Sequence, residues 1–268
     1  MSKDVKIGVA FGAGGARGLA NVGVVNVLKS EEINIDMVAG SSMGSFIAAC
    51  VALDIDLDEV MSDYKDIKKR QVLSKLYDFH NPTISLVRGK KAFGNFKKYL
   101  GNAKFSDTNI PLKIIATDLS SGEEVIIDKG SIFEAVCASC SVPGIFPPVV
   151  IKNKYLIDGG IVNPTPVNRV EEMGADVVIG VDLIMKTSSI VRKPKLMETL
   201  LRSYEIIRSI SVKYHLEKTN KDVIMLYPKM RNVIESFKFH DLNSFIESGE
   251  EAAIDALPEI KRRIEKSL

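Results

Sequence analysis

The sequence predicts an α/β fold with a mostly parallel central sheet and helices on its faces. Three observations predict it. Near the start, an apolar run over residues 5–11 leads into a glycine-rich loop and a nearly all-apolar helix. The apolar run 37–39 leads in the same way into GSSMG, at residues 40–44, and a second apolar helix. Alternating strand and helix patterns then continue to residue 183, which is typical of strands joined by helical crossovers.

Hydrophobic periodicity and turn residues assign the elements along the chain. Helices are predicted where apolar residues recur every three or four positions, and strands where short apolar runs are bounded by turn residues. The predicted strands are residues 5–11, 37–39, 112–117, 124–127, 155–157, 177–183 and 223–227. The predicted helices are residues 19–28, 46–53, 56–70, 90–100, 132–138, 167–173 and 196–216, with a mostly helical tail at 244–268 interrupted by Pro258.

Length and composition are typical of one globular domain. The chain has 268 residues, of which 46% are hydrophobic and 26% charged, so it can bury a large core. The alternation of strands and helices lies within residues 5–185. Residues 186–268 are mostly helical, and we expect them to close the same domain rather than to form a second one.

Charge, cysteines and hydropathy indicate a cytoplasmic protein without a nucleic-acid partner. The formal net charge of +2 is too small for a nucleic-acid-binding surface. Cys50, Cys137 and Cys140 have apolar or small neighbours, which fits buried reduced thiols better than disulfides or a redox centre. The N-terminus lacks the pattern of a secretory signal. No uncharged apolar run approaches the roughly 18 residues of a transmembrane segment.

Ser42 is the first candidate nucleophile. It lies at the centre of a G-x-S-x-G pattern, flanked by Gly40 and Gly44, between an apolar strand and a helix. Glycines at these positions let neighbouring backbone approach where a Cβ would clash, so the serine can occupy a sharp turn with its hydroxyl held out from the sheet. The N-terminus of the following helix favours negative charge, which suits a serine that attacks as an alkoxide.

The glycine-rich loop before residue 19 predicts an anion site. Successive backbone N–H groups in such a loop, together with the dipole of the next helix, can bind an oxyanion. A dinucleotide fits poorly, because Arg17 stands where the third glycine of G-x-G-x-x-G belongs and no acidic residue follows the next strand. Both glycine turns follow neighbouring parallel strands, so we expect them to meet at the carboxyl edge of the sheet.

Asp158 is the candidate general base. It directly follows the apolar run 155–157, so its carboxylate is also expected at the carboxyl edge of the sheet. Gly159 and Gly160 come next. Taken alone, this tripeptide is more typical of an ordinary Asp-Gly turn.

Six short segments, in order and spacing, resemble the patatin-like phospholipases. They are the glycine loop with Arg17, the GSSMG turn, IATDLSSGE from Ile115, ASCSVPGIFPPV from Ala138, the DGG at Asp158 and GADVVIGVDL from Gly174. The resemblance implies a three-layer α/β/α patatin-like catalytic domain over residues 5–185. It also implies hydrolysis of the carboxylic esters of lipids with no metal or other cofactor.

The same resemblance implies roles for individual residues. Ser42 matches the nucleophile of a catalytic dyad and Asp158 matches its base. The amides of Gly14 and Gly15 match the oxyanion hole. Ala13 stands where many members of the family carry a glycine, and its N–H can join the hole only if its backbone does not need a positive φ. The supporting residues of these motifs are Gly12, Arg17, Gly18, Gly40, Gly44, Gly159 and Gly160.

A conventional triad is the alternative mechanism. Ser42, Asp158 and then His215 or His240 follow the Ser, Asp, His order of the α/β-hydrolases. Neither histidine lies in a glycine-rich loop after a strand, and His80 precedes a turn, so we expect structural or surface roles for all three. An esterase or thioesterase using this triad, and a catalytically idle module that binds an acyl chain, remain alternative functions.

The helix predicted at residues 90–100 carries four lysines and three aromatic residues. We favour aromatics in the core with lysines in water over a lipid-facing surface. With a lipid as substrate, a transient contact between a peripheral protein and a membrane surface is also consistent with the sequence.

Overall fold

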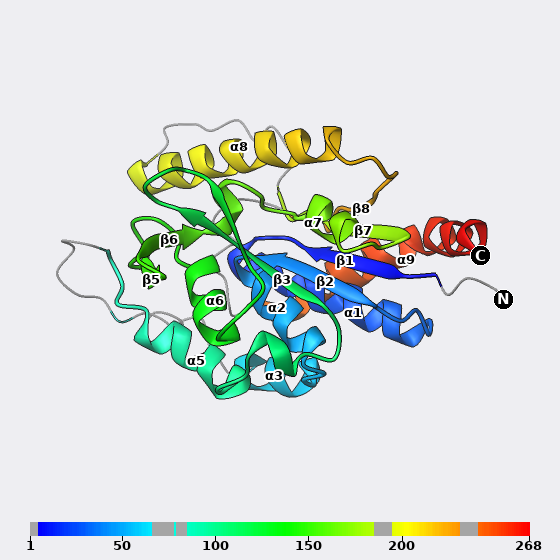
Figure 1. Ribbon diagram of the computed structural model, residues 1–268, viewed down its shortest axis with the longest axis horizontal. Helices are drawn as coiled ribbons and strands as arrows, with labels where there is room; N and C mark the ends of the chain where they lie inside the picture. The colour runs from blue at the N-terminus through cyan, green and yellow to red at the C-terminus, as the bar shows by residue number, and fades with distance from the viewer. Residues whose placement is uncertain (1–4, 66–77, 79–84, 185–194, 231–240) are drawn as a thin grey trace.

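The computed structural model describes residues 5–65, 78, 85–184, 195–230 and 241–268 (Figure 1). The strands are β1 (Ile7–Phe11), β2 (Met37–Ser41), β3 (Leu112–Asp118), β4 (Glu124–Ile127), β5 (Val149–Ile151), β6 (Lys154–Asp158), β7 (Val177–Val181) and β8 (Ile224–Leu226). The α-helices are α1 (Ala20–Ser30), α2 (Met43–Ala52), α3 (Leu57–Lys65), α5 (Lys90–Leu100), α6 (Ile132–Ser139), α7 (Val167–Glu172), α8 (Leu196–Glu217) and α9 (Leu242–Ser267). Short 3₁₀ segments are η1 (Gly15–Leu19), η3 (Phe105–Asp107) and η4 (Gly159–Ile161).

The described strands form one mixed sheet. Its order is β5-β6-β3-β2-β1-β7-β8, with β4 paired to β3. Neighbours from β3 through β2, β1 and β7 to β8 are parallel, whereas β4, β5 and β6 add antiparallel pairs. Helices α7 and α8 lie on one face and α1, α2 and α9 on the other (Figure 1). The predicted three-layer α/β/α fold with a mostly parallel sheet is confirmed.

The central strands are apolar because both of their faces are covered. Every residue of β1, β2 and β7 is buried, which is the usual state of parallel strands between two helical layers. The larger core lies between the sheet and the layer of α1 and α2. A smaller cluster under α7 contains Ala10, Met37, Ala39, Val167, Val170, Ala175 and Val178.

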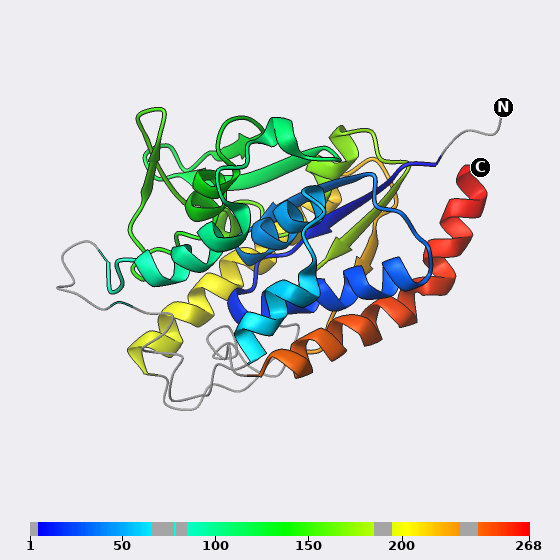
Figure 2. The same ribbon diagram turned by 90° about the horizontal axis from the view of Figure 1, so that it is seen from below.

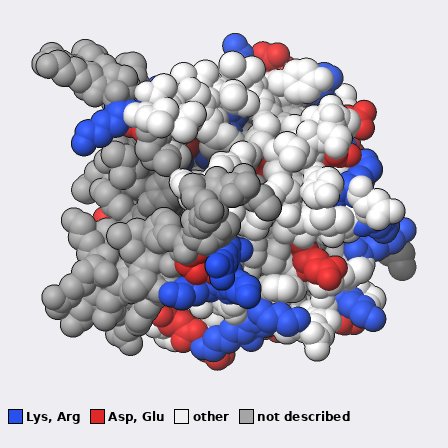
Figure 3. Space-filling model, turned by 90° about the vertical axis from the view of Figure 1, so that its left-hand side faces the viewer, with Lys and Arg blue, Asp and Glu red and all other residues white. Residues whose placement is uncertain are grey.

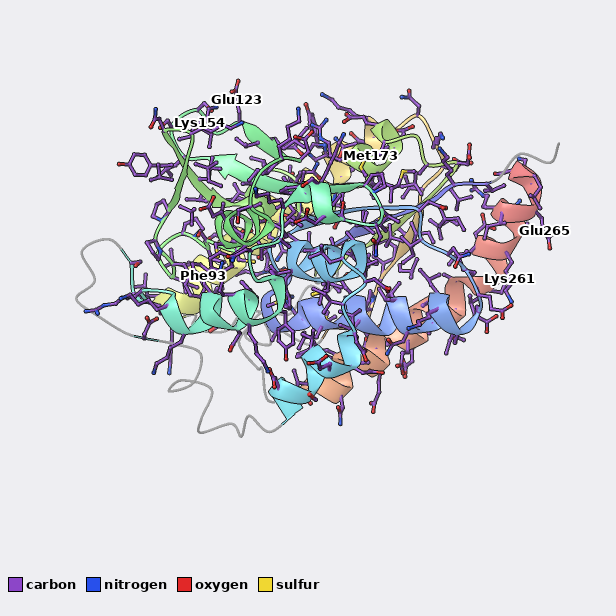
Figure 4. All side chains as sticks on the ribbon, turned by 60° about the horizontal axis from the view of Figure 1, so that its bottom comes forward. Phe93, Glu123, Lys154, Met173, Lys261 and Glu265 are labelled. Atoms are coloured by element: carbon purple, nitrogen blue, oxygen red, sulfur yellow. The ribbon has the colours of Figure 1, made fainter. Side chains whose placement is uncertain are left out.

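Helix α9, the last helix of the chain, packs along α1 (Figure 2). The two helices approach closely at glycines. A Cβ on Gly249 would lie 1.9 Å from the carbonyl oxygen of Ala20, and one on Gly23 would lie 2.1 Å from the carbonyl oxygen of Ile246. Lys261 and Glu265 mark the outer end of α9 in Figure 4.

The interruption predicted at Pro258 is wrong. Helix α9 continues through Pro258 to Ser267. Proline removes the N–H that would bond to the carbonyl of Ile254, but Ile254 is 56% exposed, so this part of the helix faces water and its carbonyl can be solvated. The predictions also missed strand β5, which follows the proline-rich segment. Residues 66–70 of the helix predicted at 56–70 lie outside the described residues.

Helix α5 has the orientation that we favoured from sequence. Phe96 is buried against Phe46, with ring centroids 4.6 Å apart, and Phe93 packs on Phe146. Its four lysines are exposed. Figure 3 views the molecule from the left-hand side of Figure 1 and shows Lys and Arg side chains gathered in the lower part of that face. Among the helices of the described residues, none combines the length and hydropathy needed to cross a bilayer.

Two antiparallel hairpins extend the sheet beyond β2. They are β3–β4 and β5–β6, and Glu123 and Lys154 lie beside their turns (Figure 4). Lys154 pairs with Asp118 at 2.9 Å, which ties the end of β3 to the start of β6. The hairpins bring Asp158, the last residue of β6, back toward the centre of the sheet.

Candidate active site

Ser42 occupies a strained turn between β2 and α2. Its φ of 52° and ψ of −129° lie outside the regions that a serine prefers. Two glycines make room for this turn. A Cβ on Gly44 would lie 2.2 Å from the carbonyl oxygen of Phe11, and one on Gly40 would lie 2.3 Å from the carbonyl oxygen of Gly44. The turn places Ser42 at the N-terminus of α2, where 7% of the residue is exposed.

Asp158 lies beside Ser42. The Ser42 hydroxyl donates a hydrogen bond of 2.6 Å to Oδ2 of Asp158. The other carboxylate oxygen, Oδ1, accepts from the Gly160 amide at 2.7 Å and from the Tyr204 hydroxyl at 2.9 Å. One oxygen of the carboxylate therefore faces the serine while two donors hold the other.

Strand register brings the two residues together. β2 pairs with β3 so that Ser41 is opposite Ile115, and β6 pairs with β3 so that Asp158 is opposite Ala116. Because Ile115 and Ala116 are consecutive, the ends of β2 and β6 meet. β6 is antiparallel to β3, so Asp158 reaches this place from the opposite direction to Ser41 rather than as the end of one more parallel strand.

Burial raises the pKa of the Asp158 carboxyl above its ordinary value. Hydrogen bonds from Ser42, Gly160 and Tyr204 and the positive charge of Arg208 act in the opposite direction, and burial outweighs them. The residue is only 1% exposed. A carboxylate with a raised pKa is a stronger base at neutral pH than an ordinary aspartate.

The glycine loop packs against the start of α2. A Cβ on Gly18 would lie 2.5 Å from Cγ of Met43, the residue after Ser42. Gly15 has a φ of 58°, which favours glycine at this position. The amides of Gly14 and Gly15 donate no hydrogen bond to any of the described residues, so both N–H groups are available to an anion.

Ala13 differs from the two glycines that follow it. Its amide donates a hydrogen bond of 2.9 Å to the carbonyl of Pro164. Its carbonyl accepts from the Arg208 guanidinium. The Ala13 N–H is therefore already engaged within the protein and is not available to an oxyanion in this structure.

A sequence model of the patatin-like phospholipases matches residues 9–170, more than half of the chain. The chain belongs to the patatin-like phospholipase family. The matched residues include the glycine loop, Ser42 and Asp158.

Several relatives carry the patatin-like segment within longer proteins. An NTE family protein of Mycobacterium tuberculosis is 32% identical over 185 residues, which cover 68% of this chain and 50% of the relative. Lysophospholipase nte1 of Aspergillus fumigatus is 31% identical over 179 residues, which cover 66% of this chain and 12% of the relative. The chain therefore spans half or less of the length of these relatives.

A solved structure shares the fold. The crystal structure of VipD from Legionella pneumophila matches with a TM-score of 0.53 and 13% sequence identity, covering 96% of this chain and 68% of that chain. At this level of identity the likeness concerns the patatin fold alone.

Helix α8 lies beyond the matched residues, yet it contributes to the site. It turns a polar stripe toward the protein and leaves apolar side chains outside, the reverse of an ordinary amphipathic helix. The sequence predicts an amphipathic helix here, with His215 as an alternative triad base and no role for Tyr204 or Arg208, although the helical spacing of the polar residues is a usable signal. The inward-facing polar residues are Tyr204, Glu205, Arg208, Ser211 and His215. The exposed apolar residues are Leu196, Leu200, Ile206, Ile207, Ile210 and Tyr214.

Buried charges tie α8 to the glycine loop. Glu205 forms an ion pair with Arg17, whose side chain is fully buried, and a second one with Arg208 at 2.9 Å. Arg208 in turn donates to the carbonyl of Ala13. Charges buried in this way must be paired, because an unpaired one costs several kcal/mol. The pairing fixes α8 over the loop.

Among the described residues, His215 forms no hydrogen bond with Ser42 or Asp158, whereas the buried Cys140 thiol faces the Ser42 hydroxyl. Nε2 of His215 lies 2.9 Å from the carbonyl oxygen of Val162, so it acts as a hydrogen-bond donor there. His80 and His240 lie outside the described residues. The three cysteines are buried and free, and burial raises the pKa of Cys137 to about 12.

Proposed function

We propose that this protein is a serine acyl hydrolase that cleaves the carboxylic esters of lipids, as a lysophospholipase or phospholipase A. Ser42 is its nucleophile and Asp158 its base. The observation that carries the proposal is the 2.6 Å hydrogen bond from the Ser42 hydroxyl to a buried carboxylate. Membership of the patatin-like phospholipase family, and relatives named lysophospholipase, support the substrate class.

The dyad carries the reaction in two halves. In the first, Oδ2 of Asp158 takes the proton from Ser42 as Oγ attacks the ester carbonyl carbon. The tetrahedral intermediate collapses, and the leaving alcohol takes that proton from Asp158. In the second half a water molecule gives its proton to Asp158 and attacks the acyl group. The fatty acid leaves and the proton returns to Ser42.

The amides of Gly14 and Gly15 form the proposed oxyanion hole. They have no acceptor among the described residues, and they belong to a loop that packs against the residue following Ser42. Two preorganised N–H donors of this kind stabilise the charge that develops on the carbonyl oxygen, and each contributes about 2.7–4 kcal/mol in other serine hydrolases. Ala13 is left out because its amide bonds to Pro164.

Ester hydrolysis by the purified protein tests the proposal. The parent, Ser42→Ala and Ser248→Ala are assayed with a p-nitrophenyl acyl ester, lysophosphatidylcholine and phosphatidylcholine. Ser248 is a matched control, because it is a buried serine of α9, away from the dyad. Its hydroxyl donates a hydrogen bond to the backbone carbonyl of Lys229. We expect Ser42→Ala to lose turnover by about a thousandfold or more and Ser248→Ala to keep it. Binding of an acyl chain without any turnover by the parent would support an idle module instead.

We also propose that residues 5–185 and 186–268 act as one domain. Within it, we propose that α8 contacts a membrane surface. The exposed apolar residues of α8 form a stripe along the helix. Ile210, for example, is 65% exposed. Exposed lysines at 195, 213 and 218 accompany the stripe. An apolar stripe with flanking lysines suits a helix that lies in the interface of an anionic membrane.

Co-sedimentation with vesicles tests this contact. Vesicles of phosphatidylcholine mixed with phosphatidylglycerol should bind the parent more strongly than vesicles of phosphatidylcholine alone. Ile210→Ser should weaken binding, whereas Ile254→Ser, a similarly exposed position on α9, should not. Equal binding by the two variants would contradict a membrane contact through α8. A dimer disrupted by Ile210→Ser would assign the stripe to a second copy of the chain.

A further inference from the structure

The two oxygens of the Asp158 carboxylate have different partners. Oδ2 faces the Ser42 hydroxyl. Oδ1 accepts a hydrogen bond of 2.7 Å from the Gly160 amide, which is only two residues along the chain. It also accepts one of 2.9 Å from the hydroxyl of Tyr204 on α8, which is 46 residues away in sequence. The side-chain donor opposite the serine is therefore Tyr204.

The position of Tyr204 is fixed by the neighbours of α8. One residue further along the helix, Glu205 pairs with Arg17 of the glycine loop. One turn further, Arg208 donates to the carbonyl of Ala13. The Arg208 guanidinium also lies 5.7 Å from the centre of the Tyr204 ring. These contacts hold the phenol against the carboxylate.

We propose that Tyr204 is a positioning residue of the dyad, which holds Oδ1 of Asp158 so that Oδ2 faces Ser42 and remains able to accept its proton. This inference rests on the proposed function. Tyr204 lies outside the residues that match the family, so the family pattern does not assign it. Its hydroxyl does not touch the reacting atoms. It acts through Asp158.

The groups around Asp158 determine in which direction the pKa of Asp158 shifts when the Tyr204 hydroxyl is removed. Arg208 and Tyr204 face it from α8, Ser42 from the start of α2, and the Cys140 thiol from the end of α6. Burial, together with the negative charge of Asp158, holds the pKa of Tyr204 well above its ordinary value, so its hydroxyl stays protonated and donates. The Tyr204 hydrogen bond lowers the pKa of Asp158 against the effect of burial. Its removal must raise that pKa further.

The pH dependence of kcat/KM tests the inference in Tyr204→Phe and in the matched control Tyr99→Phe. Tyr99 is on α5, and its hydroxyl donates to Asp63 of α3 at the protein surface. The base must be ionised, so activity is lost as pH falls through its pKa. We expect the acid limb of Tyr204→Phe to move to higher pH. At neutral pH its kcat should fall about tenfold, equivalent to about 1.4 kcal/mol, with little change in KM. Tyr99→Phe should match the parent.

A second substitution separates positioning from packing. Replacing the Tyr204 side chain by 3-fluorotyrosine keeps the ring and makes the hydroxyl a more acidic donor, so the acid limb should move to lower pH, opposite to Tyr204→Phe. A purely structural tyrosine would reduce activity or melting temperature without moving the limb, and that result would overturn the inference. The fluorinated protein also decides the case if Tyr204→Phe fails to fold.

The inference and the proposed function can fail separately. If the parent hydrolyses esters but the acid limb is the same in Tyr204→Phe and Tyr99→Phe, Tyr204 is not a positioning residue and the dyad stands. If the parent hydrolyses none of the esters, the proposed function fails. The same limb is then read from the rate at which a fluorophosphonate probe modifies Ser42. An unshifted limb in that reaction, or no modification of Ser42 in the parent, would overturn the inference as well.

Discussion

The hydroxyl of Ser139 supports the backbone of Ser42. It accepts a hydrogen bond of 2.8 Å from the Ser42 amide and donates one of 2.5 Å to the carbonyl of Ile115 on β3. Ser139 is the last residue of α6 and is fully buried. One hydroxyl thus links the strained turn to the strand that also pairs with Asp158, so the geometry of the proposed dyad depends on Ser139, which hydrogen-bonds to neither the Ser42 hydroxyl nor the Asp158 carboxylate.

Ser139→Ala should lower both stability and activity. The change leaves a buried N–H and a buried carbonyl unpaired, which costs about 1–3 kcal/mol in the free energy of unfolding. Because the Ser42 amide loses its partner, we expect kcat to fall as well. Ser131→Ala is the matched control: Ser131 caps the other end of α6, so its loss should cost about 1 kcal/mol without affecting turnover. Urea unfolding and ester hydrolysis measure both effects, and equal activity in the two variants would contradict this role.

Asp158→Asn should abolish turnover, because an amide keeps the shape of the side chain but cannot take a proton. We expect a loss of about a thousandfold or more, read from hydrolysis of the p-nitrophenyl ester. The variant should also show a pH-dependent gain in stability. Burial raises the pKa of Asp158 in the folded state, so its contribution to stability is full below the unfolded pKa and is lost as pH rises through the folded pKa. The free energy of unfolding of the variant relative to the parent should therefore increase from about pH 4 upward.

Asp118→Asn should show the opposite sign. Lys154 and the amide of Ser120 lower the pKa of Asp118, so its contribution to stability is present above the unfolded pKa and is lost as pH falls. This variant should be less stable than the parent at neutral pH and approach it in acid. The same trend with pH in both aspartate variants, measured by urea unfolding, would show that the burial of Asp158 does not govern its titration.

Changing His80, His215 and His240 together to glutamine should leave the enzyme active. Oδ2 of Asp158 contacts Ser42 directly, and His215 bonds to the carbonyl of Val162. We expect kcat/KM to stay within about tenfold of the parent, a change of no more than about 1.4 kcal/mol. A triad would lose its base and about a thousandfold in rate. His215→Gln alone controls for lost stability, and a folded triple variant as inactive as Ser42→Ala would establish the triad.

Two helical glycines should respond oppositely to alanine. A Cβ on Gly44 would meet the carbonyl of Phe11 at 2.2 Å, so Gly44→Ala must displace the turn and should cost about 2–3 kcal/mol and most of the activity. Gly94 in α5 has open space around the same position, and alanine there should add about 0.5–1 kcal/mol. Melting temperatures measure both changes. A stable, active Gly44→Ala protein would refute the close approach.

Local patterns in the sequence were enough for the parallel half of the sheet. The strands before the glycine loop and before GSSMG were predicted because a continuous apolar run followed by glycines leaves few alternatives. The local G-x-S-x-G pattern likewise predicts the turn at Ser42, although the backbone that excludes a Cβ at Gly44 is that of Phe11 on β1. Pro258 shows where such rules fail: the exposed side of a long helix can satisfy the carbonyl that a proline leaves unpaired.

The sequence by itself determined the family motifs, the α/β alternation and the position of Ser42, because each depends on residues that are neighbours in the chain. Only the tertiary structure decided the rest of the site. The approach of Asp158 depends on the register of the antiparallel β6 against β3, and register is set by pairing over distance. The polar stripe of α8 is directed inward because Asp158, Arg17 and the carbonyl of Ala13 lie beneath it. A buried polar group needs a partner, and nothing in the helix's own sequence says where that partner is.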